Sequence, residues 1–361
     1  MSIERHGLVV SIRERYFYSW PATAASLLLG ALFVVAAFYV GKWAFVDAVF
    51  RADVQACERA GGACWGFVAE KWRLIVFGRY PYELQWRPAA ALILLTGLIV
   101  ASCVPRWWTR RGFRALALLW ALGLSVFFTL MSGGVFGLEK TSSDMWGGLP
   151  LTVMLTLFGM TLSIPLGIAL ALARRSNIAL LRWLSAGYIE IVRGVPLITV
   201  LFVATFVFPL LMPVDASLSA FWRVALGIIF FQAAYLAETV RGGLQTVPKG
   251  QFEAAASLGL SSWGQIAYVI LPQALLAVIP AFVNSLLSCF MDTSLVTIVS
   301  MYDLTGSLRL ALGDASWRNY FVEGYVFVTA IYFLAGFAMS HYSRWLERRL
   351  SGGVRPQTYL L

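Results

Sequence analysis

The feature that most limits how this chain can fold is a series of apolar segments, each close to twenty residues long. A helix needs about 20 apolar residues to cross roughly 30 Å of hydrocarbon, and in lipid only helices and closed barrels satisfy every backbone group. Eight segments qualify, at residues 22–40, 88–104, 115–131, 149–173, 191–211, 221–237, 276–299 and 321–339. The sequence therefore predicts an all-α polytopic membrane protein with about eight transmembrane helices.

The composition supports this class and argues against a soluble protein. Of the 361 residues 60% are hydrophobic and 13% are charged, whereas about 25% charged residues is normal for a soluble chain. The formal net charge of +10 would suggest nucleic acid in a soluble domain. The cations instead cluster at the ends of apolar segments, so no nucleic-acid partner is expected. These clusters are Arg5, Arg13 and Arg15; Arg106, Arg110, Arg111 and Arg114; Arg174, Arg175 and Arg182; and Arg344, Arg348, Arg349 and Arg355.

The same clusters predict the orientation of the chain, because cytoplasmic loops carry an excess of Lys and Arg. With the amino terminus in the cytoplasm, alternating spans place residues 105–114, 174–190, 238–275 and the carboxyl terminus inside. Both termini are therefore expected in the cytoplasm, and the long loop 41–87 outside. In an oxidising compartment Cys57 and Cys64 of that loop can close a short disulfide, although two unpaired thiols remain the alternative.

One inside loop, at residues 238–275, has an ordered amphipathic pattern. A turn at residues 247–251 precedes a short helix from Phe252, which Gly259 ends. A second helix follows, with Ser261 or Ser262 as its cap. Two short helices that meet at a glycine can dock in a groove of another protein. We therefore expect this loop to receive force from a cytoplasmic partner; an amphipathic loop lying on lipid headgroups is the alternative.

The residues of this loop resemble those of a known family. Glu253-Ala254-Ala255, Gly259, Val269 and Leu271-Pro272 are similar in identity and spacing to the E-A-A-x3-G-x9-I-x-L-P loop of binding-protein-dependent ABC importer permeases. Valine stands where isoleucine is usual. Residues 188–197, 237–251 and 292–296 resemble the polar amino acid permeases in particular, except that Met291 replaces the lysine that usually precedes the aspartate.

The resemblance also implies a domain organisation. It covers residues 147–346 and implies a five-helix core of a type I ABC importer permease, with an ATPase-coupling loop at 238–275, here called the coupling loop. Residues 1–146 form an extension with three transmembrane helices and a periplasmic loop, similar to the larger M-type permease subunits of general L-amino acid importers in Gram-negative bacteria. Residues 347–361 form a cytoplasmic tail, and the expected location is the bacterial inner membrane.

The partners follow from the resemblance as well. The chain has no phosphate-binding loop, since Lys140 lacks the glycine directly before it that such a loop needs. ATP and Mg are therefore expected to be used by a separate subunit. The implied partners are a homologous second permease, two copies of a cytoplasmic ATPase, a periplasmic amino-acid-binding protein, an L-amino acid substrate and membrane lipid. No catalytic constellation is present, so we expect neither an enzyme nor a metal or cofactor bound by this chain.

A polar stripe in an apolar segment suggests the substrate pathway. Asn284, Ser288 and Asp292 recur at i, i+4 and i+8 and share one helix face, and an ionisable group at such depth is by default a pathway candidate. Gln232, Tyr235 and Ser294 are further candidates. The alternatives are a buried Asp292 bonded to Thr293, Ser294 or a neighbouring helix, and plain helix packing for Gln232 and Tyr235.

Two charged pairs lie near helix ends. Glu190 and Arg193 share an i, i+3 spacing, and so do Glu238 and Arg241, so each pair can neutralise itself on one helix face. Interface anchoring is favoured over a gate contact. Three glycines, Gly194, Gly242 and Gly243, are expected to permit close helix approach.

Two other functions stay open. An ion-gradient-driven secondary transporter would be expected to show inverted repeats and broken helices, neither of which is clear in the sequence. A non-transporting membrane scaffold or sensor could also use the coupling loop to recruit a partner.

Overall fold

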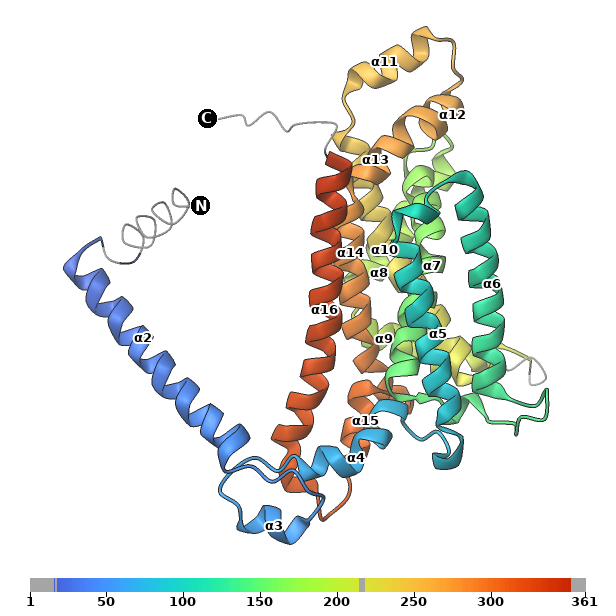
Figure 1. Ribbon diagram of the computed structural model, residues 1–361. Coiled ribbons are helices and arrows are strands. Elements are labelled where there is room, and N and C mark those ends of the chain that lie inside the picture. Colours follow the sequence, from blue (N-terminus) through green and yellow to red (C-terminus); the bar gives the residue numbers. More distant parts are fainter. Residues whose placement is uncertain (1–15, 17, 214–217, 352–361) are drawn as a thin grey trace. The chain divides into compact units, whose positions relative to one another are not determined.

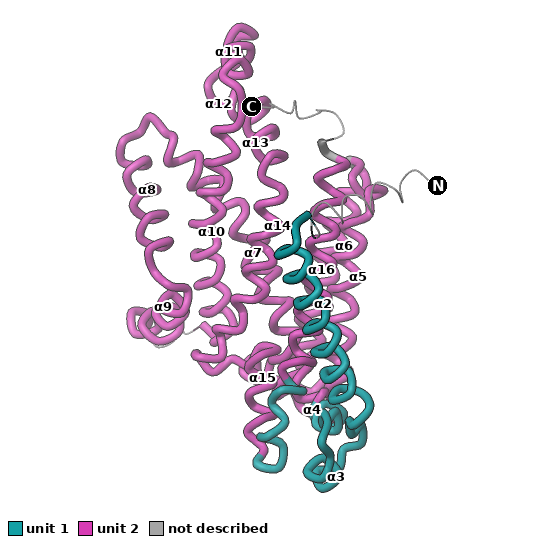
Figure 2. Tube along the Cα trace, turned by 90° about the vertical axis from the view of Figure 1, so that its left-hand side faces the viewer, with its two compact units in different colours: residues 1–71, 315–324 teal, residues 72–314, 325–361 magenta. Residues whose placement is uncertain are grey.

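The computed structural model describes residues 16, 18–213 and 218–351. It has two compact units, unit 1 with residues 1–71 and 315–324, and unit 2 with residues 72–314 and 325–361; Figure 2 colours them separately. The sequence predicts a domain boundary at residue 146, where the family core is expected to begin. That boundary is a different division from these compact units, and it stays a prediction. Arg5, Arg13, Arg15, Arg355 and most of the tail 347–361 lie outside the described residues.

Seven helical segments of the described chain are long and apolar enough to cross a membrane. They are Trp20–Val46, Tyr82–Cys103, Arg111–Ser132, Gly148–Arg174, Ala220–Thr246, Ile279–Val299 and Arg318–Arg349. Their main helices are α2 (Trp20–Gly41), α5 (Trp86–Cys103), α6 (Arg110–Ser132), α7 (Gly148–Arg174), α10 (Ala220–Thr246), α14 (Ile279–Asp292) and α16 (Phe321–Ser351). Each overlaps a predicted apolar segment, so the all-α polytopic fold is confirmed.

The span predicted at residues 191–211 is not one continuous helix. The structure has α8 (Ala179–Gly194) and a second limb Leu197–Leu211, bent by 105° from it. The limb consists of α9 (Leu197–Phe202), the π-helical turn η5 (Val203–Val207) and the 3-10 turn η6 (Phe208–Leu211). Val195 and Pro196 are extended because proline disfavours helix at the preceding residue and has no N–H to donate. Counted as one span, the bent pair brings the described chain to eight.

The core of unit 2 lies where α7 packs along α10 (Figure 1). Met154 and Leu155 of α7 and Val224 and Ile228 of α10 are buried in one cluster. Since lipid is as apolar as these side chains, close packing rather than exclusion of water stabilises such a contact. Around this pair Figure 1 shows α5, α6, α14 and α16 running along the bundle, with α11 (Lys249–Ser257) at one end and α15 (Leu304–Ala311) at the other.

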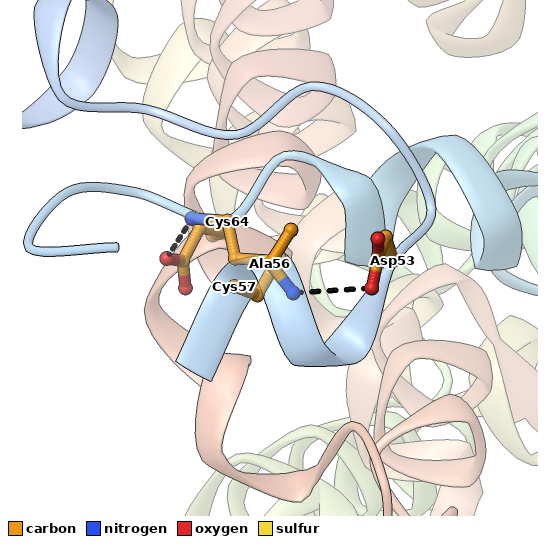
Figure 3. The surroundings of a disulfide bond; sticks show 5 residues. Asp53, Ala56, Cys57 and Cys64 are labelled. Carbon is orange, nitrogen blue, oxygen red and sulfur yellow. Dashed lines mark hydrogen bonds between the residues drawn. A yellow bond between two sulfur atoms is a disulfide. The ribbon is translucent and has the colours of Figure 1, made fainter. Parts of the chain in front are cut away.

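Unit 1 contains the predicted disulfide. Cys57, at the end region of α3 (Val54–Arg59), is bonded to Cys64, with Cα atoms 5.4 Å apart, and both residues are buried. Asp53 caps α3 by accepting from the Ala56 N–H at 3.1 Å, and the Cys64 N–H donates to Glu323 Oε1 at 2.7 Å (Figure 3). The structure therefore has the bridge rather than two unpaired thiols.

Candidate coupling and transport site

The coupling loop contains the two short helices expected from its sequence. They are α11 and α12 (Ser262–Gly264), followed by the π-helical turn η8 (Gln265–Ile270) and by α13 (Leu271–Ala277). Figures 1 and 2 show α11 and α12 projecting together from one end of unit 2. The sequence therefore places a folded projection, rather than an irregular linker, between α10 and α14.

Gly259 ends α11 through its backbone conformation. Its φ is +74°, a left-handed value that side chains other than glycine and asparagine rarely adopt. The Gly259 N–H donates to Ala256 O at 2.9 Å and the Leu260 N–H donates to Ala255 O at 3.3 Å, which is the Schellman arrangement. Apart from its chain neighbours, no atom of the described residues lies within 4 Å of where a Cβ would stand. The glycine is thus required by the turn and not by packing within this chain.

A serine caps the start of the second helix, and a glutamine side chain after it connects the following helix α13 to α11. Ser261, one of the two expected caps, accepts from the Gly264 N–H at 3.2 Å. Pro272 has no N–H to continue an α-helical ladder, and the residues before it form the π-helical turn. Gln273 Nε2 donates to Gln251 Oε1 at 3.1 Å and to Val269 O at 2.8 Å. This side chain ties α13 to α11.

The base of the projection packs against α10. Val269 and Leu271 lie against a buried cluster that includes Val240 and Leu244 of α10. Gly243 of α10 approaches α13 so closely that a Cβ would stand 2.7 Å from Ala274 O, as predicted. Gly194 and Gly242 make no such approach within the described chain, since nothing there lies within 4 Å of a Cβ at either position. The base of the projection is therefore in close contact with α10.

The outer surface of the projection combines exposed apolar side chains with one unpaired acid. Leu258, Trp263 and Tyr268 are 79%, 67% and 79% exposed. Glu253 and Ala254 are exposed and Ala255 is buried; within the described chain no cation forms an ion pair with Glu253. Large exposed apolar groups beside a polar rim are typical of a protein-binding surface.

The polar stripe of α14 points away from the packed core of this chain. Asn284 and Ser288 are exposed and Asp292 is partly exposed. The structure shows no bond from Asp292 to Thr293, whose hydroxyl donates to Phe290 O at 2.9 Å instead. The stripe therefore has no polar partner among the described residues, although lipid is an unfavourable neighbour for it.

The other three pathway candidates do not join this stripe. Gln232 is buried in α10, where it interacts with the Cys289 thiol. Tyr235 is exposed, and the Arg193 guanidinium lies 5.6 Å from the centre of its ring. Ser294 is partly buried, and its carbonyl oxygen lies 3.2 Å from Thr297 Oγ1.

The predicted helix-end pairs form a larger network across α7, α8 and α10. Arg241 Nε donates to Glu238 Oε1 at 2.7 Å, as predicted. The predicted Glu190–Arg193 pair is wrong: Glu190 binds Arg174 of α7 at 3.1 Å, and Arg193 lies 3.8 Å from Glu238. Arg174 also binds Glu238 at 3.3 Å. An i, i+3 spacing permits a pair within one helix, but here cations from neighbouring helices reach the same acids.

A second polar cluster, which the sequence did not reveal, lies at the opposite end of unit 2. Asp303 caps α15 and accepts from the N–H groups of Gly306 at 2.8 Å and Thr305 at 3.2 Å. Tyr332 Oη and Thr297 Oγ1 lie 3.1 and 3.3 Å from its carboxylate oxygens. Burial raises the pKa of Asp303, and these four donors partly oppose that rise. An aspartate before a short helix is a possible cap, but this signal alone does not predict burial.

Comparison with known proteins identifies the family. The family model "Binding-protein-dependent transport system inner membrane component" matches residues 163–352. The inner membrane amino-acid ABC transporter permease protein YhdY of Escherichia coli K12 is 41% identical over 355 residues, covering 96% of this chain and 94% of that protein. The glutamate/glutamine/aspartate/asparagine transport system permease protein BztC of Rhodobacter capsulatus is 33% identical over 412 residues, covering 96% and 95%.

A solved structure agrees with these relatives. The crystal structure of an amino acid ABC transporter with histidines matches with a TM-score of 0.51 and 30% identity, over 56% of this chain and 92% of that one. These findings support an importer permease and not a secondary transporter. The chain belongs to the family of binding-protein-dependent transport system inner membrane components, the multi-pass permease subunits of ABC importers.

Proposed function

We propose that this chain is a permease subunit of an ATP-driven importer of polar or general L-amino acids, and that α11 and α12 dock on a separate ATPase. The observation that carries the proposal is the folded projection of the coupling loop, with Trp263 and Tyr268 exposed and Glu253 unpaired. The two relatives that cover nearly the whole chain are both named as amino-acid permeases, which supports the substrate class.

The proposed complex has a homologous second permease, two ATPase subunits that bind ATP and Mg, and a periplasmic amino-acid-binding protein. The exposed stripe of Asn284 and Ser288 supports the second permease, because a facing chain would remove these side chains from lipid and enclose a polar pathway. An amino acid carries a carboxylate and an ammonium group. The Asn284 amide suits the carboxylate, and the Asp292 carboxylate suits the ammonium.

The mechanism follows from how the projection is attached. When the ATPases close on ATP, they pull α11 and α12. The close contact between Gly243 and Ala274 passes this movement to α10, and the Glu238 network passes it on to α7 and α8. Hydrolysis resets the helices, so ATP biases one of two arrangements of the bundle.

Replacing Gly259 by asparagine tests the docking directly. Asparagine tolerates a left-handed φ, so the turn survives, but its side chain enters the open space beside the glycine. We expect normal membrane insertion, with ATPase co-purification weakened about tenfold or more, which corresponds to at least about 1.4 kcal/mol, and uptake of labelled amino acid lost.

The matched control is Gly137→Asn. Gly137 has a φ of +73° and equally open surroundings, but it lies in the connection between α6 and α7, away from the coupling loop. This variant should bind the ATPase and transport normally. Normal uptake by Gly259→Asn would contradict the docking proposal, and a complex that hydrolyses ATP yet never moves amino acid would favour the scaffold or sensor function.

A further inference from the structure

A cavity of about 810 Å³ lies far from the coupling loop, between the end of α6, the connection that follows it and the start of α10. Three spans end at this point, at Ser132, Gly148 and Ala220. The end of a spanning segment marks the depth at which hydrocarbon gives way to lipid headgroups. The cavity therefore opens at the level of the headgroups.

The floor of the cavity is aromatic. Phe128 of α6 stacks on Trp222 of α10, with ring centres 5.8 Å apart and planes at 24°. Trp146 and Phe221 also line the cavity. Their rings meet edge to face, with ring centres 5.2 Å apart. Phe128 is partly buried and Trp222 is exposed, so an apolar surface remains for a ligand at the depth where acyl chains begin.

The rim of the cavity is polar and carries one cation. Lys140 is exposed, and among the described residues no carboxylate forms an ion pair with it. Ser132 and Ser143, each with a hydroxyl group, also line the cavity. Ser142 differs from them, because its hydroxyl donates to Asp144 at 3.3 Å. An ammonium group and hydroxyl donors above an apolar floor are complementary to an anionic ester that carries apolar chains.

We propose that this cavity binds the phosphate of a membrane phospholipid. Lys140 and the hydroxyls of Ser132 and Ser143 hold the phosphate, and the start of an acyl chain lies on Phe128 and Trp222. A free anion would fill the rim and leave the aromatic floor uncovered. The position at three span ends also favours a lipid over a protein partner. This site goes beyond the import function and does not depend on it.

Native mass spectrometry of the detergent-purified protein tests the site. The measured quantity is the fraction of protein ions that retain a phospholipid after reconstitution in phosphatidylethanolamine and phosphatidylglycerol. Lys140→Gln should lower this fraction about fivefold, the factor expected from losing one cation at an anionic membrane surface. Glu139→Gln is the control, because Glu139 is the adjacent exposed residue but does not line the cavity.

The possible outcomes separate the ligand classes. Equal lipid retention in the wild type and Lys140→Gln would overturn the proposal. If millimolar inorganic phosphate displaces the lipid and Trp222→Ala has no effect on retention, the site takes a free anion and not a lipid. If retention is unchanged but Lys140→Gln weakens binding of an amino-acid-binding protein, the cavity is a protein docking site. Loss of retention in Lys140→Gln and Trp222→Ala, but not in Glu139→Gln, would support the lipid site.

Discussion

At the scale of single residues, Glu238 of unit 2 is the acid on which several cations converge. Three guanidinium groups, from Arg174, Arg193 and Arg241, lie within ion-pair distance of one carboxylate. The Glu238 side chain is only 20% exposed. Without it, three partly exposed cations from neighbouring helices would repel one another.

Replacing Glu238 by glutamine should therefore destabilise the protein by about 1–3 kcal/mol, because three partly buried cations lose the negative charge that they share. The measurement is the thermal unfolding of the protein in mild detergent. Glu190→Gln is the control, since that side chain is 67% exposed and binds Arg174 alone; a change below about 1 kcal/mol is expected for such a pair. Equal effects of the two substitutions would show that the network does not centre on Glu238.

This network also shows what residue spacing can predict. The i, i+3 spacing identified the Glu238–Arg241 contact, which lies within one helix. It could not identify Arg174, because the contact of Arg174 with Glu190 and Glu238 depends on how α7, α8 and α10 pack. The deep burial of Asp303 could not be predicted from residue spacing either, because it also depends on how separate segments pack.

At the scale of elements, Asp303 connects the start of α15 to α16 through Tyr332. Because burial raises the pKa of Asp303, ionisation is less favourable in the folded protein than in the unfolded chain. The contribution of this group to stability is complete below about pH 3.9, the ordinary pKa of aspartic acid. It is lost as the pH rises through the raised folded value.

We therefore expect wild-type stability to fall between about pH 4 and the raised pKa of Asp303, and we expect Asp303→Asn to lack this slope because asparagine does not titrate. Tyr332→Phe removes one hydrogen-bond donor to the carboxylate, which raises the pKa of Asp303 further. The loss of stability should therefore continue to higher pH in this variant. Unfolding temperatures of the three proteins across the pH range provide the check. Parallel curves for wild type and Asp303→Asn would contradict the role of this carboxyl.

The elements themselves were predictable to different degrees. Apolar length alone predicted the seven spans, because the bilayer requires that length. It failed at Pro196, where apolar residues continue but the helix cannot. The turn at Gly259 followed from a glycine after a short amphipathic run, whereas the π-helical turn before Pro272 depends on local backbone adjustment that the sequence pattern does not show.

At the scale of the whole molecule, the orientation of unit 2 can be tested with two exposed positions. Trp263 in α12 is 67% exposed, and Phe136 in the connection between α6 and α7 is 92% exposed. A membrane-impermeant thiol reagent should label Phe136→Cys in intact spheroplasts, and Trp263→Cys only after permeabilisation. The wild type, with Cys103 partly buried and Cys289 buried, gives the background. The reverse pattern would place the coupling loop outside and exclude a cytoplasmic ATPase as its partner.

The bridge between Cys57 and Cys64 gives this protein a maturation requirement that its helices do not impose. Insertion into the bilayer is enough to form the spans, whereas the bridge needs a thiol oxidant. In a production host whose envelope lacks dithiol oxidase activity, the chain would be fully inserted in the membrane, but unit 1 would lack its disulfide. For this chain, yield in the membrane and correct maturation are therefore separate quantities, to be assayed separately.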